Sequence, residues 1–219
     1  MQILGPDRYN PEKLKELEAD VQVQASGGEY NSDVNFTVLR IYQFYPAYAN
    51  AGVVQKVLLM GLMRAPSTDF GVYLHMLSES LQKDDPIPAL SALGKCLAAC
   101  NFAEFWAGAD KLGSAVFGQV KGFDVCMRAS IVGMLAVVSH AQVSMAALRA
   151  ALDLKDDAAV VAFVTGAKNP AWTLAPGGAG LEVAGRDEAA PLAAGKDSEV
   201  LAFHTLGPVF TAKPITARQ

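Results

Sequence analysis

Crosslinking, metal-ligating and charged residues are scarce in this sequence. Of its 219 residues, 3 are cysteine and 3 are histidine, and the charged residues make up 18%. Three cysteines are too few for a disulfide framework, so we expect a reducing compartment. The 18 lysines and arginines against 22 aspartates and glutamates give a net charge of -4. That sign disfavours a protein whose main work is to neutralise phosphate groups.

Long apolar runs are missing as well. The longest runs, at 131–138 and 158–164, fall far short of the ~20 residues that a helix needs to cross a bilayer. The N-terminus reaches Pro6 and Asp7 before any apolar stretch develops, and it lacks the basic start of a signal or transit peptide. We therefore expect a soluble chain in the cytoplasm, without membrane contact.

Signals for helix starts recur at nearly even steps through the first half of the chain. Hydrophobic residues make up 52% of the sequence, which excludes disorder over the whole length. The candidate N-caps are 16 to 22 residues apart, so two steps make a helix pair of about 35 residues, the period of stacked helical hairpins. They are Asn10, Ser32, Asn50, Thr68, Asp85 and Asn101.

Apolar residues follow one stripe within each of these intervals, which predicts the core. The predicted stripes include Leu14, Leu17 and Val21; Val34, Val38, Ile41 and Tyr45; Phe70, Leu74, Leu77 and Leu81; Leu90, Leu93 and Leu97; and Phe102, Phe105, Trp106 and Ala109. Tyr9 and Phe44 are expected to join the last three aromatics as packing anchors. The most exposed of these rings is a candidate protein contact.

The pattern changes near Gly118 and Gly122, where glycines interrupt the helical periodicity. Three helices are predicted at 125–140, 145–152 and 156–167. Apolar residues then alternate at Trp172 and Leu174 and at Leu181 and Val183, on either side of a turn-rich loop. The fold is therefore predicted to be mainly α: a stacked helical-hairpin repeat domain (HEAT/TPR-like) at 1–121, a winged-helix domain with a β-hairpin at 122–184, and a flexible linker and tail at 185–219.

Residues that could carry chemistry do not combine into a site. Cys96 and Cys100 lie one helical turn apart, but a zinc site needs about four ligands, and the histidines at 75, 140 and 204 are scattered. We expect buried, inert thiols. Cys126 and His140 could form a nucleophilic pair, yet one continuous helix would hold them ~21 Å apart.

Two further motifs also have structural explanations. The glycine-rich loop at 177–180 has no following Lys-Ser or Lys-Thr, so a hairpin turn explains it better than a phosphate cradle. The acidic pairs at 84–85 and 156–157 stand where carboxylates complement a helix dipole. We therefore predict no catalytic, cofactor-binding or metal-binding residues, and no enzyme.

A helical repeat capped by a winged helix is the plan of PCI-type subunits, which occur in the proteasome lid, the signalosome and translation initiation factor 3. Five local motifs narrow this: Asp-Arg-Tyr-Asn-Pro-Glu at 7–12, Ile-Tyr-Gln-Phe-Tyr-Pro at 41–46, Thr-Asp-Phe at 68–70, Cys-Asn-Phe-Ala-Glu-Phe-Trp at 100–106 and Gly-Phe at 122–123. Taken in order and spacing, they resemble the family of k subunits of eukaryotic translation initiation factor 3. The resemblance covers about residues 7 to 165.

This resemblance implies a non-catalytic scaffold subunit that supports assembly of the initiation complex on the small ribosomal subunit through protein contacts. It also implies that the partners are other subunits of initiation factor 3, with subunit l foremost, and that no cofactor is needed. The sheet edge formed by Trp172, Leu174, Leu181 and Val183 is a candidate docking site, because an edge offers unpaired backbone groups to a neighbouring strand.

Two alternatives stay open at this point: a winged-helix nucleic-acid binder, and a helical-repeat adaptor of another PCI complex (proteasome lid or signalosome). A winged helix that reads DNA backs its third helix with lysine and arginine. Here that helix opens with Lys155, Asp156 and Asp157 and continues with apolar residues, and the wing has no basic residue before Arg186. We therefore predict no direct DNA binding.

Overall fold

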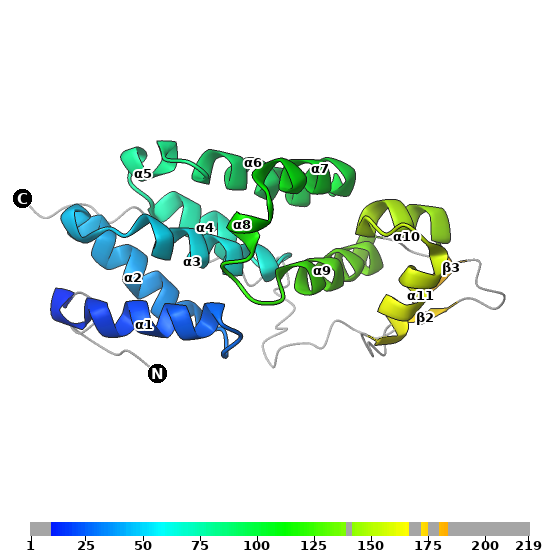
Figure 1. The fold of residues 1–219 in the computed structure, drawn as a ribbon, viewed down its shortest axis with the longest axis horizontal. Coiled ribbons are helices and arrows are strands. Elements are labelled where there is room, and N and C mark those ends of the chain that lie inside the picture. The colour runs from blue at the N-terminus through cyan, green and yellow to red at the C-terminus, as the bar shows by residue number, and fades with distance from the viewer. Residues whose placement is uncertain (1–9, 139–141, 167–171, 175–179, 184–219) are drawn as a thin grey trace, which may run out of the picture. The chain divides into compact units, whose positions relative to one another are not determined.

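The computed structural model describes residues 10–138, 142–166, 172–174 and 180–183 (Figure 1). By its internal contacts the chain divides into two units, Met1–Ala184 and Gly185–Gln219, and the second, where the linker and tail were predicted, lies outside the described residues. The described part of the first unit is mainly helical, as predicted. Its α-helices and β-strands are α1 (Leu14–Ala25), α2 (Ser32–Phe44), α3 (Ala51–Met63), α4 (Asp69–Met76), α5 (Glu79–Lys83), α6 (Ile87–Ala98), α7 (Phe102–Leu112), α8 (Ser114–Phe117), α9 (Phe123–Val138), β1 (Gln142–Ser144), α10 (Met145–Leu152), α11 (Asp157–Gly166), β2 (Trp172–Leu174) and β3 (Gly180–Val183).

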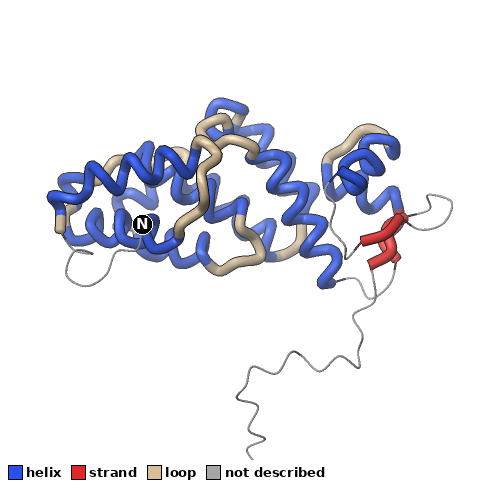
Figure 2. The backbone as a smooth tube through the Cα atoms, turned by 90° about the horizontal axis from the view of Figure 1, so that it is seen from below, coloured by secondary structure: helices blue, strands red, loops and turns tan. Residues whose placement is uncertain are grey.

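Helical hairpins build the first part of this unit. α1 packs on α2, α3 on α4 and α6 on α7, and contacts of α3 with α1 and with α6 join the pairs. The first helices of the pairs begin at Leu14, Ala51 and Ile87, about 36 residues apart. The predicted repeat is confirmed. In Figure 2 the strands lie together beside the last helices, and the repeats themselves contain none.

Asparagine side chains start three of the predicted helices by binding free backbone N–H groups. The Oδ1 atom of Asn10 accepts from Glu12 N at 2.9 Å, that of Asn50 from Gly52 N at 3.0 Å, and that of Asn101 from Glu104 N at 3.4 Å. The backbone N–H of Asn101 itself donates to the Cys96 carbonyl at 2.8 Å. These three N-caps are confirmed.

The other three predicted caps need correction. Asn31, not Ser32, caps α2, and its Oδ1 accepts from Val34 N at 3.2 Å. Thr68 stands at the N-cap of α4 but makes no side-chain capping bond. The last, α6, begins one residue after Pro86, so Asp85 is not its cap. At α2 and α4 a neighbouring side chain accepts an N–H in place of the predicted one: Asn31 at α2, and Ser67, whose Oγ accepts from Asp69 N at 3.2 Å, at α4. At α6 the N-cap position is occupied by Pro86, which has no capping side chain.

The predicted apolar stripes form the core, with exceptions at two places. Leu17, Val38, Leu90 and Phe105 are among the residues that are at most 1% exposed. Phe44 and Tyr45 are 61% and 41% exposed, so both were wrongly assigned to the core. Pro46 follows Tyr45, and a proline pushes the preceding residue out of helical geometry, so the Tyr45 ring leaves the buried face. Phe44 is the last residue of α2, so the proline does not account for its exposure. Tyr9 lies outside the described residues.

The predicted stripe at residues 70–81 is interrupted at Leu77. Leu77 has a ψ of 141°, which ends α4, and Ser78 then caps α5 by accepting from Leu81 N. Leu77 is buried, but Phe70, Leu74 and Leu81 are only partly so. Two short helices therefore replace the single predicted one.

The second part has the element order of a winged helix: α9, β1, α10, α11, β2 and β3. The strands form one antiparallel sheet in the order β1-β3-β2. The three-residue strand β1 was not predicted, since Val143 between Gln142 and Ser144 is too short an alternation to identify. Because α9 packs against both α3 and α10, the division at residues 121 and 122 stays a prediction.

Candidate protein-docking surfaces

Metal-binding side chains do not cluster in the part of the chain that the structure describes. There, no three histidine, cysteine, aspartate or glutamate side chains are close enough to hold a metal ion. Cys96 is half-buried and Cys100 is exposed, so the prediction of buried thiols was wrong for Cys100. Cys126 is exposed as well. Cys100 has a φ of 55° in the turn after α6, which carries it out of the helix. His140 and His204 lie outside the described residues.

The four predicted docking residues lie in two paired strands. Trp172 pairs with Val183, and Leu174 pairs with Leu181. On its other side Leu181 pairs with Val143 of β1, so β3 is the central strand and the edges of the described sheet are β1 and β2. An added strand would therefore have to join β1 or β2. The docking role of these residues stays a prediction, and the loop at 175–179 lies outside the described residues.

The third helix of the winged helix, α11, has no cation among its residues 157–166. Asp157 at its first position pairs with Arg149 of α10 at 3.4 Å. Val160 and Val164 are buried, and Ala158 and Ala162 are exposed. This helix therefore offers an apolar, weakly acidic surface in the place where a DNA-reading winged helix has lysine and arginine.

Trp106 joins the repeat to the winged helix. Its side chain is 8% exposed, and its indole Nε1–H donates to the Ala151 carbonyl of α10 at 2.8 Å. The Arg128 guanidinium of α9 lies 5.0 Å from the centre of the indole ring, and its Nε–H donates to the Leu152 carbonyl at 2.9 Å. The sequence identified Trp106 as a core residue. Its polar partners, the Ala151 carbonyl and the Arg128 guanidinium, both lie on other helices. No local sequence pattern predicts contacts between such distant residues.

A tyrosine pair ties the turn after α1 to α4. The Tyr30 hydroxyl donates to Asp69 Oδ2 at 2.6 Å, so the Tyr73 hydroxyl must be the donor in its 2.7 Å bond with Tyr30. Arg64 lies over the Tyr30 ring at 5.2 Å from its centre. Burial, followed by the bond to Asp69, raises the pKa of Tyr30 well above its ordinary value, and burial also raises the pKa of Tyr73. Both phenols are thus held protonated, which suits structural hydrogen bonds.

Aromatic rings stand exposed at the turn between α2 and α3. Phe44, Tyr45 and Tyr48 are 61%, 41% and 58% exposed. The two tyrosine rings lie 6.2 Å apart with an interplanar angle of 54°. Tyrosines and phenylalanines that are partly exposed are typical of protein interfaces. Phe44 is the most exposed of the predicted aromatic anchors that the structure describes, and its role as a protein contact stays a prediction.

Comparison with known proteins links this fold to one family. A sequence profile described as the CSN8/PSMD8/EIF3K family matches residues 48–191. The chain is 40% identical over 124 residues to a protein of Xenopus laevis and 37% identical over 124 residues to one of Homo sapiens, both named eukaryotic translation initiation factor 3 subunit K. Each alignment covers 57% of this chain and 56% of the relative, so it spans little more than half the length of these relatives.

A third relative extends the match. A Dictyostelium discoideum protein, also named eukaryotic translation initiation factor 3 subunit K, is 29% identical over 168 residues, which is 77% of this chain and 67% of that protein. The family resemblance drawn from the five sequence motifs is confirmed. The profile covers well over half of the chain, and the chain therefore belongs to the CSN8/PSMD8/EIF3K family.

Proposed function

We propose that this chain is a non-catalytic scaffold subunit of eukaryotic translation initiation factor 3, which supports assembly of the initiation complex on the small ribosomal subunit. The observation that carries the proposal is its similarity to proteins named subunit K of that factor, at 37–40% identity over 124 residues. The function itself is protein binding, and it would take place in the cytoplasm without a cofactor or a membrane. Within the described residues, no helix is long and apolar enough to cross a membrane.

The partners in this proposal are other subunits of the factor, with subunit l as the first contact. The repeat domain (1–121) supplies a rigid frame, and the winged helix (122–184) supplies the docking sheet. Edge strands β1 and β2 suit this role because each is paired with β3 on one side only. Strand addition would give main-chain hydrogen bonds without a polar pocket.

The absence of cations from α11 argues against the nucleic-acid alternative. Phosphate contacts supply most of the affinity of DNA-binding domains. The exposed residues at the start of this helix are Lys155, Asp156 and Asp157, and Arg149 is already paired with Asp157. At this position Lys155 and Arg149 balance the charges of Asp156 and Asp157, so a phosphate backbone would meet no net positive surface. A protein partner would meet exposed apolar alanine.

Co-expression of the full chain with subunit l tests the docking step. Trp172→Pro and Thr173→Pro each remove one N–H from β2, and successive N–H groups of an antiparallel strand point to opposite sides. One variant therefore breaks the pairing with β3, and the other removes only an outward N–H. Thermal melting of each purified variant distinguishes the two.

We expect the variant that keeps the parent's melting temperature to lose most of its capture of subunit l. If both variants capture subunit l at the parent's yield, β2 is not the docking strand. If the parent chain captures no subunit of the factor at all, the proposed function is wrong.

A further inference from the structure

An apolar groove of about 670 Å³ lies between the end of α3, α4 and α6. Leu62, Phe70, Leu74 and Leu97 supply its apolar surface, and the exposed Gly71 and Ala98 lie among its lining residues. Gly94 shapes this groove. A Cβ atom at Gly94 would stand 2.1 Å from Cε1 of Phe70, so only glycine lets the ring lie against α6.

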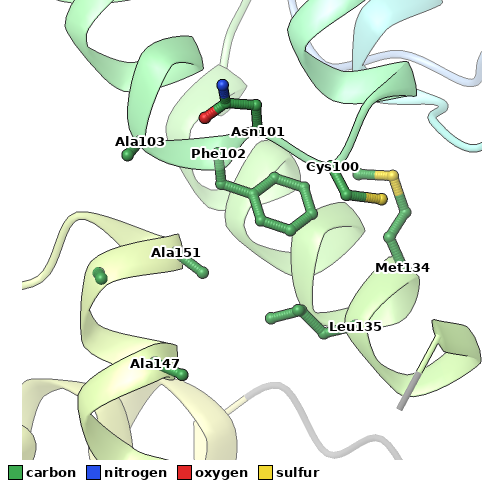
Figure 3. Close-up of a pocket in the computed structure, with 9 residues that line it drawn as sticks. Cys100, Asn101, Phe102, Ala103, Met134, Leu135, Ala147 and Ala151 are labelled. Carbon is green, nitrogen blue, oxygen red and sulfur yellow. The ribbon is translucent and has the colours of Figure 1, made fainter.

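A second hollow, of about 330 Å³, adjoins the groove near the start of the winged helix. It lies between the start of α7, α9 and α10, and Figure 3 shows the Phe102 ring and Leu135 facing the space beside Ala147 and Ala151. Cys100 and Met134 line both hollows, and their side chains point toward each other. Because the two hollows adjoin at these shared residues, we treat them together as one surface, which we call the apolar trough.

The charge of the apolar trough has one sign. Of the described residues that line it, His75 and Lys95 are those that can carry a positive charge, and none is aspartate or glutamate. Both side chains are exposed. In a chain with a net charge of -4, a trough free of lining carboxylates is complementary to an acidic, apolar partner.

The walls of the trough limit the backbone conformation of a partner segment that can bind there. They are mostly helices, whose N–H and C=O groups are already paired within each helix, and the loop at 65–68 and the turn at 100–101 complete the lining. The helical walls offer no edge to which a strand could add. A partner helix satisfies its own backbone and needs only side-chain contacts. Small exposed residues at Gly71, Ala98, Ala103 and Ala150 let such a helix approach closely.

We propose that the apolar trough binds an amphipathic α-helix of a partner protein, with an apolar stripe toward Leu74 and Phe102 and carboxylates toward His75 and Lys95. The trough is a different surface from the sheet edges. The inference does not depend on the assignment to initiation factor 3, since it rests on the shape and charge of the trough alone.

A synthetic helix tests this inference on the full-length chain. The probe is a fluorescent leucine, alanine and glutamate peptide of about 18 residues, ~27 Å long when helical, with a lysine version of the same pattern for comparison. Two variants fill or recharge the trough, Ala98→Glu and Lys95→Glu. Two matched controls make the same changes at exposed residues outside it, Ala92→Glu on α6 and Lys111→Glu on α7.

Fluorescence anisotropy should show saturable binding of the glutamate peptide, which both trough variants weaken by at least about tenfold and both controls leave unchanged. The lysine peptide should bind far more weakly. Unchanged thermal melts establish that all four variants fold.

Three results would overturn the inference. They are a lack of saturable binding of the glutamate peptide, binding of that peptide by Ala98→Glu as tightly as by the parent, and equal binding of the glutamate and lysine peptides. Sedimentation that shows a dimer of the parent, dissociated by Ala98→Glu, would assign the trough to a second copy of this chain and also overturn it.

Discussion

Single aromatic side chains with a polar tip hold this molecule together at places where distant segments meet. Trp106 combines a buried ring, a hydrogen bond to the Ala151 carbonyl and a guanidinium against its face. The spacing of the sequence was enough to predict its burial. The hydrogen bond was not predictable, because it depends on where α10 comes to lie, which is a property of the whole fold.

Replacement of Trp106 by alanine should lower the free energy of unfolding by about 3–5 kcal/mol, since it removes a large buried ring and leaves the Ala151 carbonyl without its donor. Lys83→Ala is the control. Lys83 bonds Glu79 on an exposed helix face, and its loss should change the free energy by less than about 0.5 kcal/mol. Thermal melts of the two variants compare them, and equal melting temperatures would show that the indole is not a packing anchor.

The tyrosine network predicts a loss of stability at alkaline pH. The pKa of Tyr30 is raised by burial and by Asp69, so as pH increases the unfolded chain loses its phenol protons before the folded chain does. The contribution of the Tyr30 phenol to the free energy of unfolding is therefore complete below pH ~10 and falls as pH rises above that value.

Tyr30→Phe should flatten this alkaline decline without abolishing it, because the pKa values of Tyr42 and Tyr73 are raised as well. Urea unfolding of parent and variant between about pH 8 and pH 11 measures both slopes. Identical slopes would mean that the Tyr30 phenol ionises equally easily in the folded and unfolded chain.

At the scale of elements, caps and apolar stripes were predictable because both depend on residues at most a few positions apart. Asn10, Asn50 and Asn101 were identified in this way, and so was the period of the repeat. The predictions failed where the choice was between neighbours, as at Asn31 and Ser32, or where a three-residue strand depended on a distant partner, as at β1. The prediction for Tyr45 failed because the following proline takes this residue out of the helix.

Two of the predicted caps differ in structure and should differ in energy. Asn50 Oδ1 accepts from two backbone N–H groups at the start of α3, so Asn50→Ala should cost about 1 kcal/mol. Thr68 makes no side-chain capping bond, so Thr68→Ala should cost less than about 0.5 kcal/mol. Urea unfolding of the two variants gives the comparison, and an equal or larger loss at Thr68 would contradict these cap assignments.

At the scale of the whole molecule, the fold positions the proposed docking surfaces. Their charge favours a protein partner over nucleic acid. The same winged helix could in principle read nucleic acid. Its third helix has no cation, and its first carboxylate holds the nearest arginine. The sequence alone already showed that this helix lacks basic residues. The sheet order and the apolar trough became visible only in the three-dimensional arrangement.

We expect the full chain to bind neither duplex DNA nor RNA with useful affinity at physiological salt. Titration of labelled DNA and RNA at low and moderate salt checks this. A complex of about micromolar affinity or tighter that weakens steeply with salt, as phosphate contacts do, would support the nucleic-acid alternative instead.

The central claim is membership of the initiation factor complex, and affinity purification of the tagged full chain from its own cells tests it most directly. Mass spectrometry should find the subunits of translation initiation factor 3 in near-equal amounts, with subunit l among them and small-subunit ribosomal proteins as a weaker, salt-sensitive group. Recovery of proteasome lid or signalosome subunits in their place, or of the tagged chain alone, would contradict the account.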